Sequence, residues 1–192
     1  MFGSLFKQKY KKVTDEDIAQ ALYECALNSA RNPAFYEEYD VPDSFDGRFD
    51  MLLIHIFVIL RKVQNEENYE EFSQILFDIT FINMDQTLRE MGIGDMGIPK
   101  HMRRMMTAFN GRMHSYQMAI DPESLKEKDI EGLKKTTLSE ALRRNLYGTV
   151  DEMELNKDNI TKMCKYIRAN LERKSDADIL EIRRGNAKFY GV

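Results

Sequence analysis

The sequence is poor in the residues that interrupt helices or cross-link small domains: its 192 residues include four prolines, ten glycines, two cysteines and no tryptophan. With so few chain breakers and few β-branched runs, the composition favours helices. Cys25 and Cys164 lie far apart, so they cannot form a Cys-x-x-Cys motif, a Cys/His metal site or a disulfide framework. A reducing compartment is therefore expected.

A membrane-spanning run is also absent from the sequence. The longest apolar stretch, Met51–Leu60, is about half the length of a spanning helix, and His55 interrupts it. Residues Met1–Leu5 lack the apolar core and the small-residue cleavage site of a secretory signal. We expect a chain that is cytosolic or bound to one face of a membrane.

The net charge of −4 is unevenly distributed along the chain. Residues 1–83 hold 8 basic and 15 acidic side chains, whereas residues 84–192 hold 20 basic and 17 acidic ones. The second part is thus mildly cationic, but far less so than a dedicated nucleic-acid-binding domain. DNA is not expected as a partner.

The sequence contains no HExxH, P-loop or GxSxG motif. Its histidines, His55, His101 and His114, are not spaced as a pair on one helical turn. Residues 92–97 match the letters of GxGxxG but lie between two expected helices rather than after a strand, which removes the mechanism of that motif. We expect no catalytic residue, cofactor or metal, and a protein that is not an enzyme.

Carboxylates gather in two places, at Asp43, Asp46 and Asp50 and again at Asp78 and Asp85. Paired acids on facing helices can bind di-iron, but the Glu-x-x-His motif that completes such sites is missing. The first group fits the start of a helix, where acids complement the helix dipole and Arg48 pairs with one of them. This structural role is favoured over a metal site.

Hydrophobic spacings of three and four residues predict a succession of helices. The predicted helices span Thr14–Arg31, Asp43–Lys62, Tyr69–Glu90, Pro99–Ile120, Leu133–Tyr147, Asn159–Leu171 and Asp176–Arg184. The second of them is apolar on every side, which places it at the centre of the fold, with His55 as a core histidine satisfied by hydrogen bonding. The predicted fold is all-α: a single-domain helical bundle with a central apolar helix.

The chain divides into residues 1–13 and the helical domain of residues 14–192. Residues 2–12, FGSLFKQKYKK, combine aromatic and leucine side chains with four lysines. A segment of this composition is expected either to be a disordered basic arm or to contact an anionic membrane surface.

Methionine is concentrated in one region, since eight of the twelve methionines lie between Met84 and Met118. On the predicted helix after Pro99, a stripe comprises Met102, Met106, Phe109, Met113 and Tyr116. The stripe either faces the core or remains partly exposed to bind an apolar client, for which flexible methionine side chains are well suited. Exposure is expected near the turn at residues 91–97, where Gly92 and Gly94 are expected to serve backbone geometry.

The residues around this turn are the candidates for partner binding. They are Met84, Asp85, Arg89, Met91, Asp95, Met96, Lys100, Arg103 and Met106. The charged members could equally be helix caps and surface ion pairs worth under about 1 kcal/mol each.

Four segments of the chain resemble motifs of the ubiquinol–cytochrome c chaperone family. They are Val41–Asp50 with the apolar helix after it, Asn83–Lys100, Phe109–Arg112 and Leu142–Gly148. The resemblance covers roughly residues 15–148, with a looser match to the end. Asn110 departs from the pattern, which resembles Phe-x-Gly-Arg with an aromatic residue at that position.

The resemblance implies a chaperone whose client is cytochrome b or another subunit of the cytochrome bc complex (respiratory complex III). The mitochondrial relative in that family acts with a small partner protein and near the ribosomal exit, so these are further candidate partners. Peripheral membrane contact is expected instead from the composition of residues 2–12. Because no mitochondrial presequence is visible, the chain resembles bacterial members, and we expect it in the cytoplasm or at the inner face of the inner membrane.

Two other functions are compatible with the same residues. A helical carrier would enclose a lipid or isoprenoid with the Met and Phe stripe. A structural interaction module would use that stripe in a constitutive oligomer.

Overall fold

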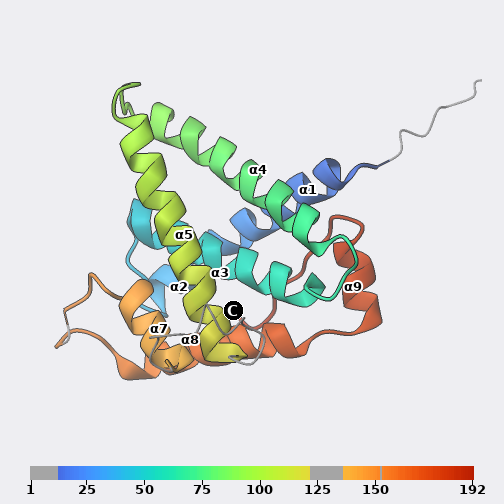
Figure 1. Cartoon of the computed structure of the whole chain (residues 1–192). Helices are drawn as coiled ribbons and strands as arrows, with labels where there is room; N and C mark the ends of the chain where they lie inside the picture. Colours follow the sequence, from blue (N-terminus) through green and yellow to red (C-terminus); the bar gives the residue numbers. More distant parts are fainter. Residues whose placement is uncertain (1–12, 122–135, 152) are drawn as a thin grey trace, which may run out of the picture.

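The computed structural model describes residues 13–121, 136–151 and 153–192. Helices make up all the regular structure of this part of the chain, and they form one domain, which confirms the expected single-domain helical bundle. Their bounds are α1 Asp15–Ala30, α2 Ala34–Glu37, α3 Phe45–Val63, α4 Tyr69–Glu90, α5 Ile98–Ile120, α7 Leu138–Asn145, α8 Lys157–Glu172 and α9 Asp176–Ile182 (Figure 1). The segment 1–12, expected as a basic arm, lies outside the described residues.

Helix ends follow local capping chemistry. Thr14 and Asp17 form a capping box at the start of α1, and the Ser44 side chain accepts a hydrogen bond from the Gly47 amide at the start of α3. Residues 133–135 of the helix predicted at 133–147 lie outside the described residues. In the described part, Thr137 and Glu140 close a capping box that starts α7 at Leu138, and the helix ends at Asn145. The bounds expected for α4 agree with the structure at both ends.

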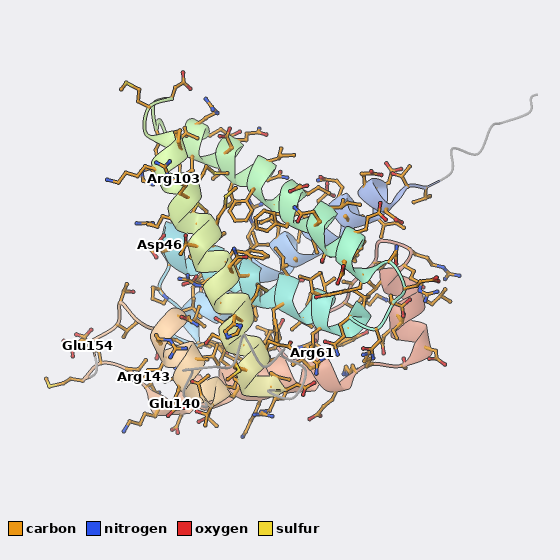
Figure 2. The ribbon with its side chains drawn as sticks, viewed as in Figure 1. Asp46, Arg61, Arg103, Glu140, Arg143 and Glu154 are labelled. Carbon is orange, nitrogen blue, oxygen red and sulfur yellow. The ribbon has the colours of Figure 1, made fainter. Side chains whose placement is uncertain are left out.

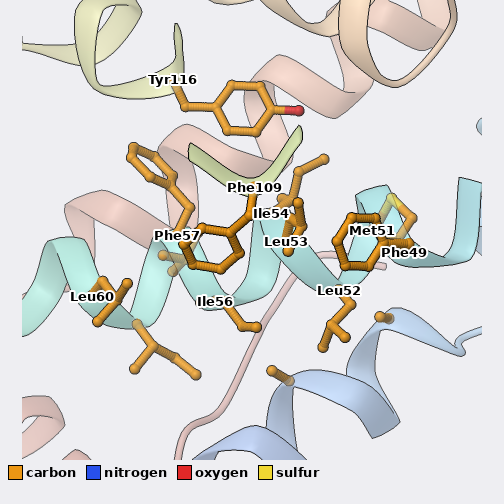
Figure 3. Packing of buried hydrophobic residues seen from close by; sticks show 14 of the residues in the cluster. Phe49, Met51, Leu52, Leu53, Ile54, Ile56, Phe57, Leu60, Phe109 and Tyr116 are labelled. Carbon is orange, nitrogen blue, oxygen red and sulfur yellow. The ribbon is translucent and has the colours of Figure 1, made fainter. Parts of the chain in front are cut away.

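Helix α3 lies within the core. Every residue from Phe49 to Leu60 is buried. The helix packs against α1, α5, α8 and α9 (Figure 1). Leu52 and Ile56 point toward α1, whereas Phe57 faces α5 (Figure 3), where its ring centroid lies 5.6 Å from that of Tyr116. The apolar surface on all sides of α3 is thus covered by different elements of the same domain. No helix in the described part of the chain combines the length and hydropathy needed to cross a bilayer.

His55 is the buried polar group at the centre of α3. Its Nδ1 lies 2.7 Å from the Met51 carbonyl oxygen, and its Nε2 lies 2.8 Å from the Tyr166 hydroxyl of α8. Because a carbonyl can only accept, Nδ1 carries the proton and Nε2 accepts from Tyr166. Burial lowers the pKa of His55 to about 4, so the ring is neutral near pH 7.

We predict that His55 makes folding stability fall as the pH is lowered. The unfolded histidine titrates near 6.5, so below that pH the unfolded chain binds a proton that the folded chain resists until about pH 4. His55→Gln removes this group. The free energy of unfolding of the wild type, relative to this variant, should decrease by about 2 kcal/mol between roughly pH 7 and pH 5. Urea unfolding at the two pH values measures the difference, and a pH-independent difference would contradict the assignment.

Candidate interaction surface

The turn between α4 and α5 forms a tip that projects from the body of the domain (Figure 1). Gly92 ends α4 with a φ of 84°, a left-handed conformation that glycine adopts without a steric penalty. Its amide donates to the Arg89 carbonyl at 2.9 Å, and the Ile93 amide donates to the Leu88 carbonyl at 3.1 Å. Gly94 does not share this role: it has no positive φ, and a Cβ there would meet open space. The conformational requirement expected for both glycines therefore holds for Gly92 only.

Methionines at the tip are exposed, whereas most of the methionine stripe faces the core. Met91 is 55% exposed and Met96 is 99% exposed. Met84 is buried, with 6% of its surface accessible, and Met106 is partly buried against the core. Of the candidate methionines, only Met91 and Met96 thus present their side chains to solvent at the turn.

The charged candidates at the tip fall into two groups. Arg89 binds two carboxylates, with 2.6 Å from its Nε to Asp85 and 2.5 Å from its Nη1 to Asp95. These hydrogen bonds raise the pKa of Arg89 and stabilise the end of α4 against the turn. Lys100 and Arg103 are exposed (Arg103 is labelled in Figure 2), and none of the ion pairs within the described residues includes either of them. The tip therefore offers two exposed thioethers next to two uncompensated cations.

A groove with a volume of about 790 Å³ lies between α3, α4 and α5, and no pattern in the sequence predicted it. Phe57 and Leu60 of α3 line it together with Phe77 of α4 and Met113 of α5. Glutamine and asparagine side chains supply much of the remaining lining, including Gln64, Gln74, Asn110 and Gln117. The aromatic rings of Phe77, Phe81 and Phe109 pack together with centroid distances of 4.5 to 5.7 Å. This aromatic cluster joins α4 to α5 on the side of the groove nearer the tip.

Two of the segments that carry the family resemblance are joined by a buried ion pair, and a third binds α5 close to it. Arg112 Nε of α5 lies 2.5 Å from Asp50 Oδ1 of α3, and only 3% of Asp50 is exposed. Three residues after Arg112, Ser115 accepts a hydrogen bond of 2.6 Å from Arg144 of α7. Burial raises the pKa of Asp50 to about 6, although the Arg112 guanidinium acts to lower it. These polar groups fix α5 to α3 and α7, and so set the direction in which the tip extends.

The other carboxylates near the start of α3 also serve helix packing. Arg48 pairs with Asp43 at 2.6 Å, as expected, and Asp46 binds Arg104 of α5 at 2.9 Å (Asp46 is labelled in Figure 2). Gly47 is required by close approach, because a Cβ at this position would lie 2.0 Å from the Pro42 carbonyl oxygen. Across the described residues, no three His, Cys, Asp or Glu side chains are grouped closely enough to hold a metal ion.

Comparisons with known proteins agree with the resemblance seen in the sequence. A family model described as "Ubiquinol-cytochrome C chaperone" matches residues 37–189. A crystal structure of the Cbp3 homolog from Brucella abortus is similar to the chain, with a TM-score of 0.68 and 29% sequence identity. The match covers 92% of this chain and 91% of that one. A search of curated proteins gives no significant match.

We predict that Arg112→Gln destabilises the fold in a pH-dependent way. The folded chain already holds the Asp50 proton more tightly than the unfolded chain does, so this carboxyl costs stability as the pH rises through its folded pKa of about 6. Without Arg112 that pKa rises further, and at about pH 8 the buried charge should cost about 3 kcal/mol. The loss should be smaller at about pH 5, where Asp50 is mostly protonated.

Urea unfolding at the two pH values measures this loss. Arg104→Gln is the matched control, because it breaks an exposed pair to the same helix and should cost less than about 1 kcal/mol at either pH. Equal losses for Arg112→Gln at both pH values would show that Asp50 is not held as a buried charge.

Proposed function

The chain belongs to the ubiquinol-cytochrome C chaperone family, and on this premise we propose that it holds newly made cytochrome b during assembly of the cytochrome bc complex. The family match supports a role in binding another protein rather than in catalysis. In this proposal the chain is an assembly factor in the cytoplasm or at the inner face of the inner membrane. It releases its client when the client enters the complex.

The observation that carries this proposal is the exposure of Met91 and Met96 at the tip. A membrane protein that has not yet been inserted exposes apolar side chains of varied shape, and methionine adapts to such shapes because it is unbranched and polarizable. Lys100 and Arg103 are placed next to the thioethers, where they can bind carboxylates or carbonyl groups of the client. The groove between α3, α4 and α5 adds apolar side chains, among them Phe77 and Met113, beside polar ones such as Gln74 and Gln117.

The function as a lipid or isoprenoid carrier is less well supported. Carriers and small-molecule sites enclose most of the ligand surface. The groove is instead an open one between α3, α4 and α5. Two of the aromatic residues that line it, Phe57 and Phe109, are nearly buried and so offer little surface to a ligand. Family membership also favours the chaperone.

Other contacts implied by the family resemblance belong to the same proposal. They are a small partner protein and the ribosome, which would bring the chaperone to its client during synthesis. The proposal assigns no described residue to either contact.

We predict that Met91→Gln/Met96→Gln impairs client binding without unfolding the protein. Both side chains are exposed, so the melting temperature should change little, whereas the client loses about 1 to 2 kcal/mol of apolar contact. The amount of cytochrome b that co-purifies should then fall on the order of tenfold, with a lower level of cytochrome bc complex in cells.

Met153→Gln provides the matched control, because this methionine is 94% exposed but lies between α7 and α8, away from the tip. The control should bind cytochrome b as the wild type does. If the double variant binds as well as the control, the tip is not the client surface. If removal of the whole chain leaves the level of the cytochrome bc complex unchanged, the proposed function itself is wrong.

A further inference from the structure

The outer face of α8 carries a strong excess of positive charge. Residues 157–174, which comprise α8 and the two residues after it, contain six basic and two acidic side chains. Helix α8 buries Ile160, Met163 and Ile167 against the domain, whereas Lys162, Lys165 and Arg168 are exposed on the opposite side. These three cations are three residues apart, so they are neighbours on one helical face.

The cations of this face lack acidic partners. No carboxylate of the described chain forms an ion pair with Lys162, Lys165 or Arg168. Five exposed arginines elsewhere are paired in contrast, namely Arg48, Arg89, Arg104, Arg183 and Arg184. The charge of α8 is therefore available to an external anion.

The acidic side chains are concentrated on the other side of the molecule. Helix α1 has four acidic and no basic residues, and α4 has five acidic residues and Arg89. The two helices pack against each other, and Figure 1 shows them at the top of the view, with α8 along the bottom. The domain is thus electrically polar, although its net charge is only −4.

A pocket of about 250 Å³ lies at the C-terminal end of α8. Arg168 and Lys174 line it together with the apolar side chains of Ile120 and Leu171. Arg61, which also lines it, is paired with Asp121 at 2.5 Å, and Glu172 contributes a carboxylate. Cations next to apolar side chains suit the phosphate of a lipid headgroup and the first part of its acyl chains.

We infer that the outer face of α8 docks the protein on a membrane surface that contains anionic phospholipids. Such a surface attracts each nearby Lys or Arg, and the attraction extends about 8 Å at physiological ionic strength. Only the facing side of the protein is within that range, so α8 is attracted while the acidic α1–α4 side remains distant. The tip lies away from α8 in Figure 1, which leaves it free to bind a client while the protein is docked.

A nucleic acid fits this face less well. Single-stranded nucleic acids are bound by cations together with aromatic side chains on which bases stack. The tyrosine of α8, Tyr166, is 5% exposed and donates to His55 in the core, so it is not available for stacking. The neighbouring Tyr39 and Tyr190 rings already lie against Lys162 and Arg173. The inference does not depend on which client the tip binds.

Vesicle flotation with the full chain tests this inference. The wild type should float with vesicles of phosphatidylcholine mixed with phosphatidylglycerol, and should not float with phosphatidylcholine alone. Lys162→Gln/Lys165→Gln/Arg168→Gln should lower the partition coefficient on the order of 100-fold. Binding by the wild type should weaken as salt is raised.

Two control variants separate α8 from other sources of charge. Arg31→Gln/Arg183→Gln/Arg184→Gln removes three exposed cations elsewhere and should bind close to the wild-type level. Lys7→Gln/Lys9→Gln/Lys11→Gln/Lys12→Gln tests the N-terminal segment and should retain α8-dependent binding. The inference is overturned if the α8 variant binds like the wild type, if either control loses as much, or if neutral vesicles bind equally. It is also overturned if the face binds an RNA oligonucleotide but not anionic vesicles.

Discussion

The burial of α3 on all sides from Phe49 to Leu60 is the constraint on which the rest of the structure depends. A helix that is apolar on every side must be covered on every side, and here α1, α5, α8 and α9 share the task. The C-terminal segment completes the cover, since the centroid of the Phe189 ring lies 4.6 Å from that of the His55 ring. Polar groups on α3 must then find partners inside the domain. His55 is hydrogen-bonded to Met51 and Tyr166, and Asp50 forms an ion pair with Arg112.

The exposed tip follows from this constraint. Arg104 and Arg112 tie α5 along the start of α3, and the Phe77–Phe81–Phe109 cluster joins α4 to α5. The turn at residues 91–97 then extends past the surface that α3 can bury, which leaves Met91 and Met96 in solvent. A rigid core thus supports a pliable apolar end, as a protein that binds clients of varied shape requires. The buried face of α8 belongs to the same core, and its charged face is directed outward.

The sequence predicted the features that are determined locally. The bounds of α4 and its stop at the turn that begins with Gly92 both follow from periodicity and capping chemistry within a few residues. The same reasoning could not predict that Met84 is buried whereas Met91 is exposed. The two are seven residues apart, at and near the end of α4, so their spacing places them on the same face, and their burial depends on packing against other helices. The Asp50–Arg112 pair, the groove and the unpaired cations of α8 also depend on contacts between distant segments. Gly94 shows the converse, since a glycine in a turn was expected to need its conformational freedom and does not.

The central claim is that the tip between α4 and α5 contacts cytochrome b while that client is being made. A photo-crosslinking residue placed at Met96 of the full-length protein, and at Met153 as the control, tests it directly. The account predicts an adduct with nascent or newly released cytochrome b from position 96 and little or none from position 153. Adducts of equal yield from both positions, or none from position 96 under conditions in which the cytochrome bc complex assembles normally, would contradict it.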